Sequence, residues 1–343
     1  MRNDSVAYIK EGRRQRFRRW FVVTGVLVGL ACLLCMLMLL LGNTIYPISD
    51  VIRTLMGENI QSVSFAVNVI RLPRMIAGFF AGFAFGVAGT IFQTLFRNPL
   101  ANPNVLGITA GSSAAAVFCI VIFQSSNAVI SNVSFIAGLL TVAVIYGLSK
   151  IRGFSIGRLI LIGIGVQAMF DALISYLLLV SDEQNLPAAL RWLNGSLNGS
   201  QMDELPPLII SVLILLPIVM LLTKHLSILE LGDQSAVSLG VHTDITRMAL
   251  VLSSVAMISL ATSTTGPIAF ISFLAGPIAK RLVGYGLSTI IPAGFVGANL
   301  VLAADLIGQF AFHVRFPVGV ITGIIGAPYL IYLLIRMNQR GEL

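Results

Sequence analysis

Charged side chains are scarce in this sequence of 343 residues. Only 10% of the residues are Asp, Glu, Lys or Arg, against about 25% in soluble domains, while 57% are hydrophobic and the mean hydropathy is +0.93. Such a composition excludes a soluble globular protein, because one core cannot bury so much apolar surface. Continuous apolar runs of about twenty residues favour transmembrane helices over the alternating strands of a transmembrane β-barrel. We therefore predict an all-α fold, a polytopic bundle of membrane helices.

Cysteine and histidine are also rare, with three of each. Cys32, Cys35 and Cys119 lie in apolar runs without histidine or carboxylate neighbours, so we expect small buried hydrophobes rather than metal ligands or a disulfide. No G-x-x-x-x-G-K-[ST] phosphate loop, H-E-x-x-H or G-x-S-x-G motif occurs. We predict no catalytic residue, no metal site and no cofactor bound by this chain, which is therefore not expected to be an enzyme.

Polar or Gly/Pro-rich strips divide the apolar sequence into ten predicted spans. The spans are 20–41, 66–95, 103–123, 128–149, 157–180, 206–223, 247–263, 267–283, 288–309 and 318–336. Residues 1–19 form a basic tail, and residues 20–340 form a single transmembrane domain.

The positions of the basic residues predict the orientation. An even number of spans places both termini on one side of the membrane. If that side is the cytoplasm, 17 of the 22 Lys and Arg lie in cytoplasmic strips, as the positive-inside rule requires. Topology and lipid headgroups then account for the net charge of +8, without a basic face for nucleic acid. We expect a multi-pass protein of the cytoplasmic membrane with both termini cytoplasmic.

Three glycines in the second predicted span, Gly78, Gly82 and Gly86, recur every four residues. This spacing places them on one helix face, where small residues let another helix backbone approach closely. We interpret them as helix-packing residues.

Two carboxylates fall inside predicted spans, Asp171 in the fifth and Asp305 in the ninth. Such residues can form an intramembrane proton or cation site. Alternatively, each carboxylate lies near a helix end or a water-filled cavity and pairs with a neighbour's hydroxyl or backbone. For Asp305 we favour pairing, because it lies close to the end of its span; for Asp171 both interpretations stay open. The residues alone thus predict a polytopic transporter, and a proton- or sodium-coupled secondary transporter using both carboxylates is one alternative.

The segment from Arg71 to Ala115 carries R-L-P-R, a glycine-rich helix, a glutamine, N-P-L-A-x-P and L-G in order. This segment closely resembles the FecCD or BtuC-like permeases of ABC importers, which take up iron chelates and cobalamin. Three further runs, RWLNGSLNG, LGDQSAVSLGV and GPIAFISFLAGPIAKR, resemble later segments of that family, as does PVGVITGIIGAPYLIYLL. The resemblance covers nearly the whole chain after the first twenty residues.

The resemblance implies a BtuC-like, type II permease with ten spans in a bacterial cytoplasmic membrane. It implies a second permease subunit, two cytoplasmic ATPase subunits that carry ATP and magnesium, and an extracytoplasmic substrate-binding protein. The implied cargo is an iron(III)-siderophore, with iron present only inside the chelate; cobalamin or haem is the alternative for the same machine. We expect a paralogue as the second permease, with a homodimer still open.

By the same resemblance, Arg71 and Arg74 lie at the outer mouth and dock carboxylates of the binding protein. The family's third outer arginine aligns with Gln309. Two alternatives stay open: Arg315 replaces it on the outer face, or this subunit docks its binding protein with fewer charges. On the cytoplasmic side, Asn98-Pro99-Leu100 is expected to form the inner gate, where two prolines prevent helix continuation.

A cytoplasmic loop over about 224–246 resembles the segment that couples these permeases to their ATPase. We expect Asp233 to cap a short helix over Gln234–Leu239, which ATP-driven closure of the ATPases would push. The family's Pro-His pair aligns with Gly276-Pro277, so the family's histidine is missing here. The residues with a predicted coupling role are Leu231, Gly232, Asp233, Ala236, Leu239 and Gly240.

Overall fold

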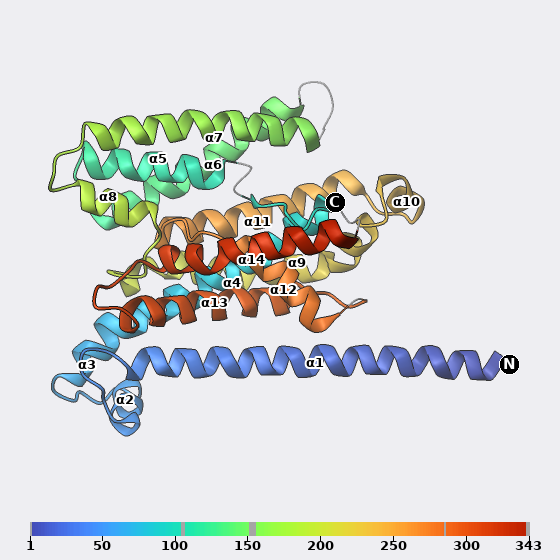
Figure 1. The fold of residues 1–343 in the computed structure, drawn as a ribbon, viewed down its shortest axis with the longest axis horizontal. Helices are drawn as coiled ribbons and strands as arrows, with labels where there is room; N and C mark the ends of the chain where they lie inside the picture. The colour runs from blue at the N-terminus through green and yellow to red at the C-terminus, as the bar shows by residue number, and fades with distance from the viewer. Residues whose placement is uncertain (1, 104–106, 151–155, 285, 341–343) are drawn as a thin grey trace.

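The structure is a computed structural model that describes residues 2–103, 107–150, 156–284 and 286–340, without the side chains of 2–9, 150, 156, 337 and 340. Helices run along one common direction (Figure 1), and no strand occurs in these ranges. The helices are α1 (Arg2–Leu40), α2 (Ile48–Leu55), α3 (Val63–Phe65), α4 (Leu72–Leu95), α5 (Ile108–Val121), α6 (Asn127–Lys150), α7 (Ile156–Leu179), α8 (Leu186–Leu193), α9 (Pro206–Leu229), α10 (Asp233–Ser238), α11 (Thr243–Thr265), α12 (Ile271–Val283), α13 (Ile290–Phe310) and α14 (Val318–Arg340).

Eight helices in the described part of the chain are long and apolar enough to cross a membrane. The third and eighth predicted spans correspond to the shorter α5 and α12, of 14 and 13 residues. At 1.5 Å per residue each is about 20 Å long, less than the hydrocarbon core of about 30 Å. The predicted start of the eighth span at residue 267 is wrong, because Gly266 and Phe270 have φ of 71° and 65°, outside the helical region.

Several other helices are longer than the hydropathy predicts, α1 and α9 among them. The α1 helix continues through the basic tail to Arg2, and α9 continues past residue 223 to Leu229. No glycine or proline interrupts residues 224–229, so the chain stays helical until the turn at Gly232.

The start of α1, the short α10 and the end of α14 lie at the same end of the bundle, on the right of Figure 1. We call this the α10 end. The opposite end carries α2, α3 and α8. Both ends of the helical chain therefore lie on one side, as an even number of crossings requires.

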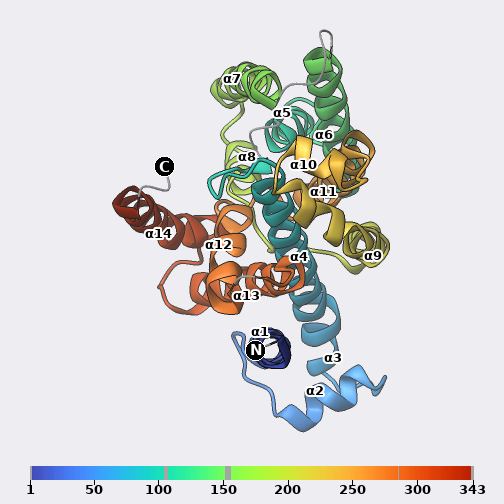
Figure 2. The same cartoon turned by 90° about the vertical axis from the view of Figure 1, so that its right-hand side faces the viewer.

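The α4 helix occupies the centre of the bundle (Figure 2). In an apolar stretch of 18 residues, 78% of the residues are buried for the segment that contains α4, against 17% for α7. Glycines allow this packing. A Cβ atom added to Gly82 would lie 2.6 Å from the Gly297 carbonyl oxygen of α13, and one added to Gly78 would lie 2.8 Å from Leu197. Gly86 likewise faces the Ala293 carbonyl. The backbones of α4 and α13 therefore meet directly.

Candidate functional site

The C-terminus of α4 ends in a strained residue. Arg97 has φ of 50°, the left-handed region where glycine is usual. Asn98 N donates to Gln93 O (3.0 Å) and Arg97 N to Thr94 O (3.2 Å), the two bonds of a Schellman motif. A non-glycine residue there costs on the order of 1 kcal/mol, which marks the position as a candidate functional one.

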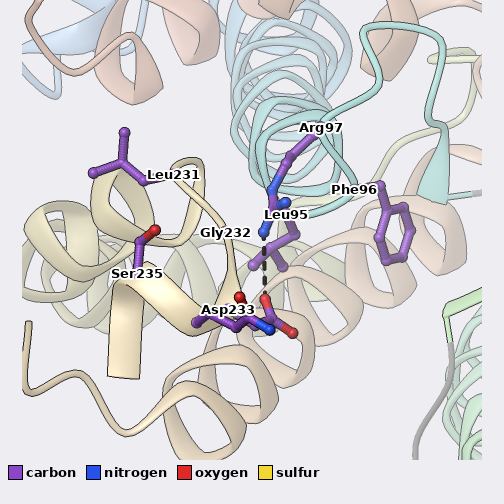
Figure 3. A pocket seen from close by; sticks show the side chains of 8 residues that line it. Leu95, Phe96, Arg97, Leu231, Gly232, Asp233 and Ser235 are labelled. Carbon is purple, nitrogen blue, oxygen red and sulfur yellow. Dashed lines mark hydrogen bonds and ion pairs between the residues drawn. The ribbon is translucent and has the colours of Figure 1, made fainter. Parts of the chain in front are cut away.

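The side chain of Arg97 joins α4 to the end of α9. Its Nε and one terminal nitrogen donate to the carbonyl oxygen of Leu229, at 3.2 and 2.9 Å. That carbonyl belongs to the last turn of α9, where carbonyl groups have no partner within the helix. The terminal nitrogen also lies 3.3 Å from Asp233 Oδ1 (Figure 3). One guanidinium thus contacts both α9 and α10.

Asp233 is the centre of this contact. Its Oδ1 also accepts a hydrogen bond of 2.9 Å from buried Arg247 of α11. The expected capping role is wrong: Asp233 is the first residue of α10, and Gly232, with φ of 110°, takes the capping position without a side-chain hydrogen bond. The carboxylate binds the two guanidinium groups instead of capping the backbone N–H groups of α10, because charged donors form stronger hydrogen bonds than neutral ones.

We call Arg97, Asp233 and Arg247 the ionic junction. It lies beside a pocket of 410 Å³ formed by the end of α4 and the start of α10 (Figure 3). The junction connects four segments: the strip after α4, the end of α9, α10 and the start of α11. A displacement of α10 would therefore act directly on the strip that carries Asn98.

Beyond the junction, exposed apolar side chains flank α10 on both sides. Leu231 and Leu239 are 65% and 61% exposed, and Gly240 follows with φ of 80°. Ala236 is buried and fixes the inner face of the helix. Exposed leucines beside a fixed turn suit a partner surface.

The predicted gate residues form a local turn at the α10 end. Asn98 Oδ1 accepts the N–H of Leu100 at 2.8 Å, and Asn98 O accepts the N–H of Ala101 at 2.9 Å. Asn98 and Pro99 are exposed. The continuation through residues 104–106 lies outside the described residues, and the gating role stays a prediction.

At the opposite end, Arg74 and Asp305 form a two-pronged ion pair. Arg74 Nε and a terminal nitrogen each donate to Asp305 at 2.8 Å, and Gln309 Nε2 donates at 2.7 Å. The Asp305 side chain is 1% exposed. This carboxylate is therefore paired, but its partners are a guanidinium and a side-chain amide rather than the hydroxyl or backbone group that we expected, and Arg74 is already engaged within the chain.

The two other predicted docking arginines differ in exposure. Arg71 is buried and donates to the carbonyl oxygens of Leu39, Leu40 and Thr44 at 2.7–2.9 Å, so it holds the end of α1. Arg315 is exposed, with Asn43 as its hydrogen-bond partner. Of the three arginines, Arg315 is the best placed to reach another protein, while docking by each of them stays a prediction.

Asp171 lies on the exposed surface of α7, and its backbone carbonyl accepts a hydrogen bond from the hydroxyl of Ser175. It lies about 12 Å along the helix from Leu179, well inside the span. In the described ranges, no three histidine, cysteine or carboxylate side chains gather into a possible metal site. The expectation that the chain holds no metal or cofactor stays a prediction.

The sequence reasoning missed Arg97 and Arg247. Arg97 was visible as the basic residue directly before the predicted gate, but no short-range pattern connects it to Asp233, 136 positions away.

Comparison with known proteins agrees with the helical architecture. The model of the FecCD transport family matches residues 30–336. The ferric enterobactin transport system permease protein FepG of Escherichia coli strain K12 is 35% identical over 94% of this chain and 98% of its own length. The achromobactin transport system permease protein CbrC of Dickeya dadantii is 35% identical over 98% of both chains. A solved structure of an inward-facing metal-chelate type ABC transporter covers 92% of this chain, and this chain covers 99% of it, at 25% identity and a TM-score of 0.82.

Proposed function

Because the chain belongs to the FecCD transport family, we propose that it is the membrane-spanning permease of an ABC importer that moves an iron(III)-siderophore across a bacterial cytoplasmic membrane. The chain is an integral membrane protein by its eight long apolar helices. We infer the cargo from the relatives of this chain, whose names specify ferric enterobactin and achromobactin.

The observation that supports coupling to an ATPase is the ionic junction. Exposed Leu231 and Leu239 flank α10, and Asp233 ties α10 to Arg97 and Arg247. A subunit that presses on α10 would move the end of α4 with it. In this proposal the α10 end is cytoplasmic, ATP and magnesium bind the partner ATPases, and the chain itself catalyses no reaction.

A second permease subunit would cover the poorly buried face of α7. Asp171 is exposed in the middle of that helix, and a carboxylate facing hydrocarbon is costly. A water-filled passage between two permeases would hydrate it. Of the three outer arginines, Arg71 and Arg74 are engaged within the chain and Arg315 is exposed, which favours a paralogue as the second subunit. In this proposal an extracytoplasmic binding protein docks at the end where Arg315 is exposed.

Reconstituted transport tests this proposal. The permease, its paralogue and the ATPase, placed in liposomes with the binding protein outside, should take up iron-55 siderophore with ATP inside and not with a non-hydrolysable ATP analogue. Cobalamin and haem serve as alternative cargoes. Uptake that persists without ATP and stops when the proton gradient is collapsed would refute the proposal and favour secondary transport.

A further inference from the structure

A second cavity at the α10 end is strongly basic. It has a volume of 830 Å³ and lies between the ends of α4, α9, α12 and α14. Glu230 is the single carboxylate among its lining residues, all of which the structure describes. We call this cavity the basic pocket. The cationic residues that line it are Arg19, Arg97, Lys280, Arg281 and Arg336.

Three of these cations have neutral partners. Arg19 donates to the carbonyl oxygens of Arg281 and Leu282 at 3.1 and 2.9 Å. Arg336 donates to the hydroxyl of Tyr332 at 2.8 Å, and Arg281 contacts the hydroxyls of Tyr329 and Tyr332. In the described ranges no carboxylate lies within ion-pair distance of Arg19, Arg281 or Arg336. Their positive charge is therefore available to a ligand.

The rest of the wall suits a polar ligand larger than phosphate. Thr90, Gln93 and Thr94 of α4 supply hydroxyl and amide groups, and two tyrosines of α14 also line the pocket. The volume falls in the range of about 300–1,000 Å³ that is usual for small-molecule sites. A single phosphate would leave most of this space to water.

The basic pocket also touches the strip after α4, because Arg97, Asn98 and Pro99 line it. If this strip forms the inner gate that the sequence predicts, cargo that passes the gate reaches the pocket next. We propose that the basic pocket is a transient exit site that binds negatively charged ferric chelates, such as tris-catecholate or carboxylate complexes, in preference to neutral ones. This proposal rests on the proposed function and adds the charge class of its cargo.

Direct binding tests it. The full permease–ATPase complex in phosphatidylcholine nanodiscs is dialysed against two iron-55 complexes of equal coordination number. One is the trianionic complex of a hexadentate tris-catecholate, and the other is the neutral complex of a hexadentate tris-hydroxamate. We expect the trianionic chelate to bind at least about tenfold tighter. Equal affinities would overturn the proposal.

Variants locate the binding. The double variant Arg281→Gln/Arg336→Gln should weaken binding of the trianionic chelate about tenfold, since two partly hydrated charge contacts are lost. Arg281→Lys/Arg336→Lys keeps the charges and should retain most of the affinity, which separates charge from misfolding. The matched control, Arg14→Gln/Arg18→Gln, removes two exposed charges of α1 outside the pocket and should leave binding unchanged. Unchanged affinity in the first variant would refute the proposal.

Two competitors distinguish other sources of anion. Displacement of the trianionic chelate by an equal concentration of inorganic phosphate would identify a phosphate site and overturn the proposal. Loss of chelate binding in phosphatidylglycerol nanodiscs would identify a lipid-headgroup site and would also overturn the proposal. ATP-driven uptake of both chelates without charge preference would refute this inference alone, whereas absence of ATP-driven uptake of either chelate would refute the proposed function as well.

Discussion

Arg74 and Asp305 join α4 to α13 through two parallel hydrogen bonds of 2.8 Å, 231 residues apart in the sequence. Both side chains are largely withdrawn from solvent, at 14% and 1% exposure. The pair lies at the end of the bundle opposite α10, and the same two helices also meet through glycines in the middle of α4. Its energetic role is therefore to keep this end of α4 fixed against α13.

Removal of one member of this pair should destabilise the protein. Asp305→Ala leaves the Arg74 guanidinium buried without its carboxylate, and we expect a loss of about 3 kcal/mol in the free energy of unfolding. Thermal unfolding in a fixed detergent, followed by tryptophan fluorescence, measures it. Arg74→Met/Asp305→Leu, which removes both charges, should recover most of the stability; equal stability of Asp305→Ala and wild type would contradict the assignment.

Asp233→Asn should separate ATP hydrolysis from transport. The substitution weakens the ionic junction, so α10 no longer moves the strip after α4, and we expect uptake to fall about tenfold while the ATPase activity of the complex persists. Stability should change by less than about 1 kcal/mol, because Asp233 is half-exposed. Asp244→Asn, also exposed and near the start of α11, is the matched control. Parallel loss of hydrolysis and uptake would argue against a coupling role.

Gly82→Ala should destabilise the bundle by about 1–3 kcal/mol, because the new methyl group would overlap the Gly297 carbonyl of α13. Gly29→Ala is the control, since a Cβ atom there meets no atom within 4 Å. The midpoint of thermal unfolding should fall for the first variant and stay the same or rise for the second. A similar response of the two would show that α4 and α13 can separate freely.

The outer arginines should respond differently to substitution. Arg71→Met removes the donors of three carbonyl groups and should cost about 2 kcal/mol of stability. Arg315→Met should leave stability within about 0.5 kcal/mol and slow association with the binding protein several-fold, more strongly at low salt. Surface plasmon resonance at two ionic strengths measures the association rate. An association rate independent of Arg315 would remove it from the docking surface.

Asp171→Asn tests the secondary-transport alternative. If the carboxylate only faces water in a passage, ATP-driven uptake should change less than about twofold, and a protonophore should have no effect on either protein. The assay is iron-55 uptake by proteoliposomes with ATP inside. Complete loss in the variant, together with sensitivity of the wild type to the protonophore, would instead assign proton transfer to Asp171.

The sequence predicts the long helices well, because a span of about twenty apolar residues is a local property. It fails at the start of α12, where apolar residues continue through non-helical backbone before the helix begins; hydropathy does not distinguish the two conformations. The motif over Leu231–Val241 predicted a short helix there, and α10 is present, but the ion pairs of Asp233 were not predicted. Helix capping is readable from neighbouring residues, whereas pairing with Arg97 and Arg247 depends on how four segments meet in space.

The direct contact between the backbones of α4 and α13 has a consequence for how this protein can change shape. Helices that touch through glycines and carbonyl oxygens cannot slide without steric overlap, so these two helices move as one rigid body. Figure 2 places α5, α6 and α7 on the other side of α4 from α12, α13 and α14. Spin labels on α4 and α13 should therefore keep one distance throughout the transport cycle, and the informative pairs join α7 to α14.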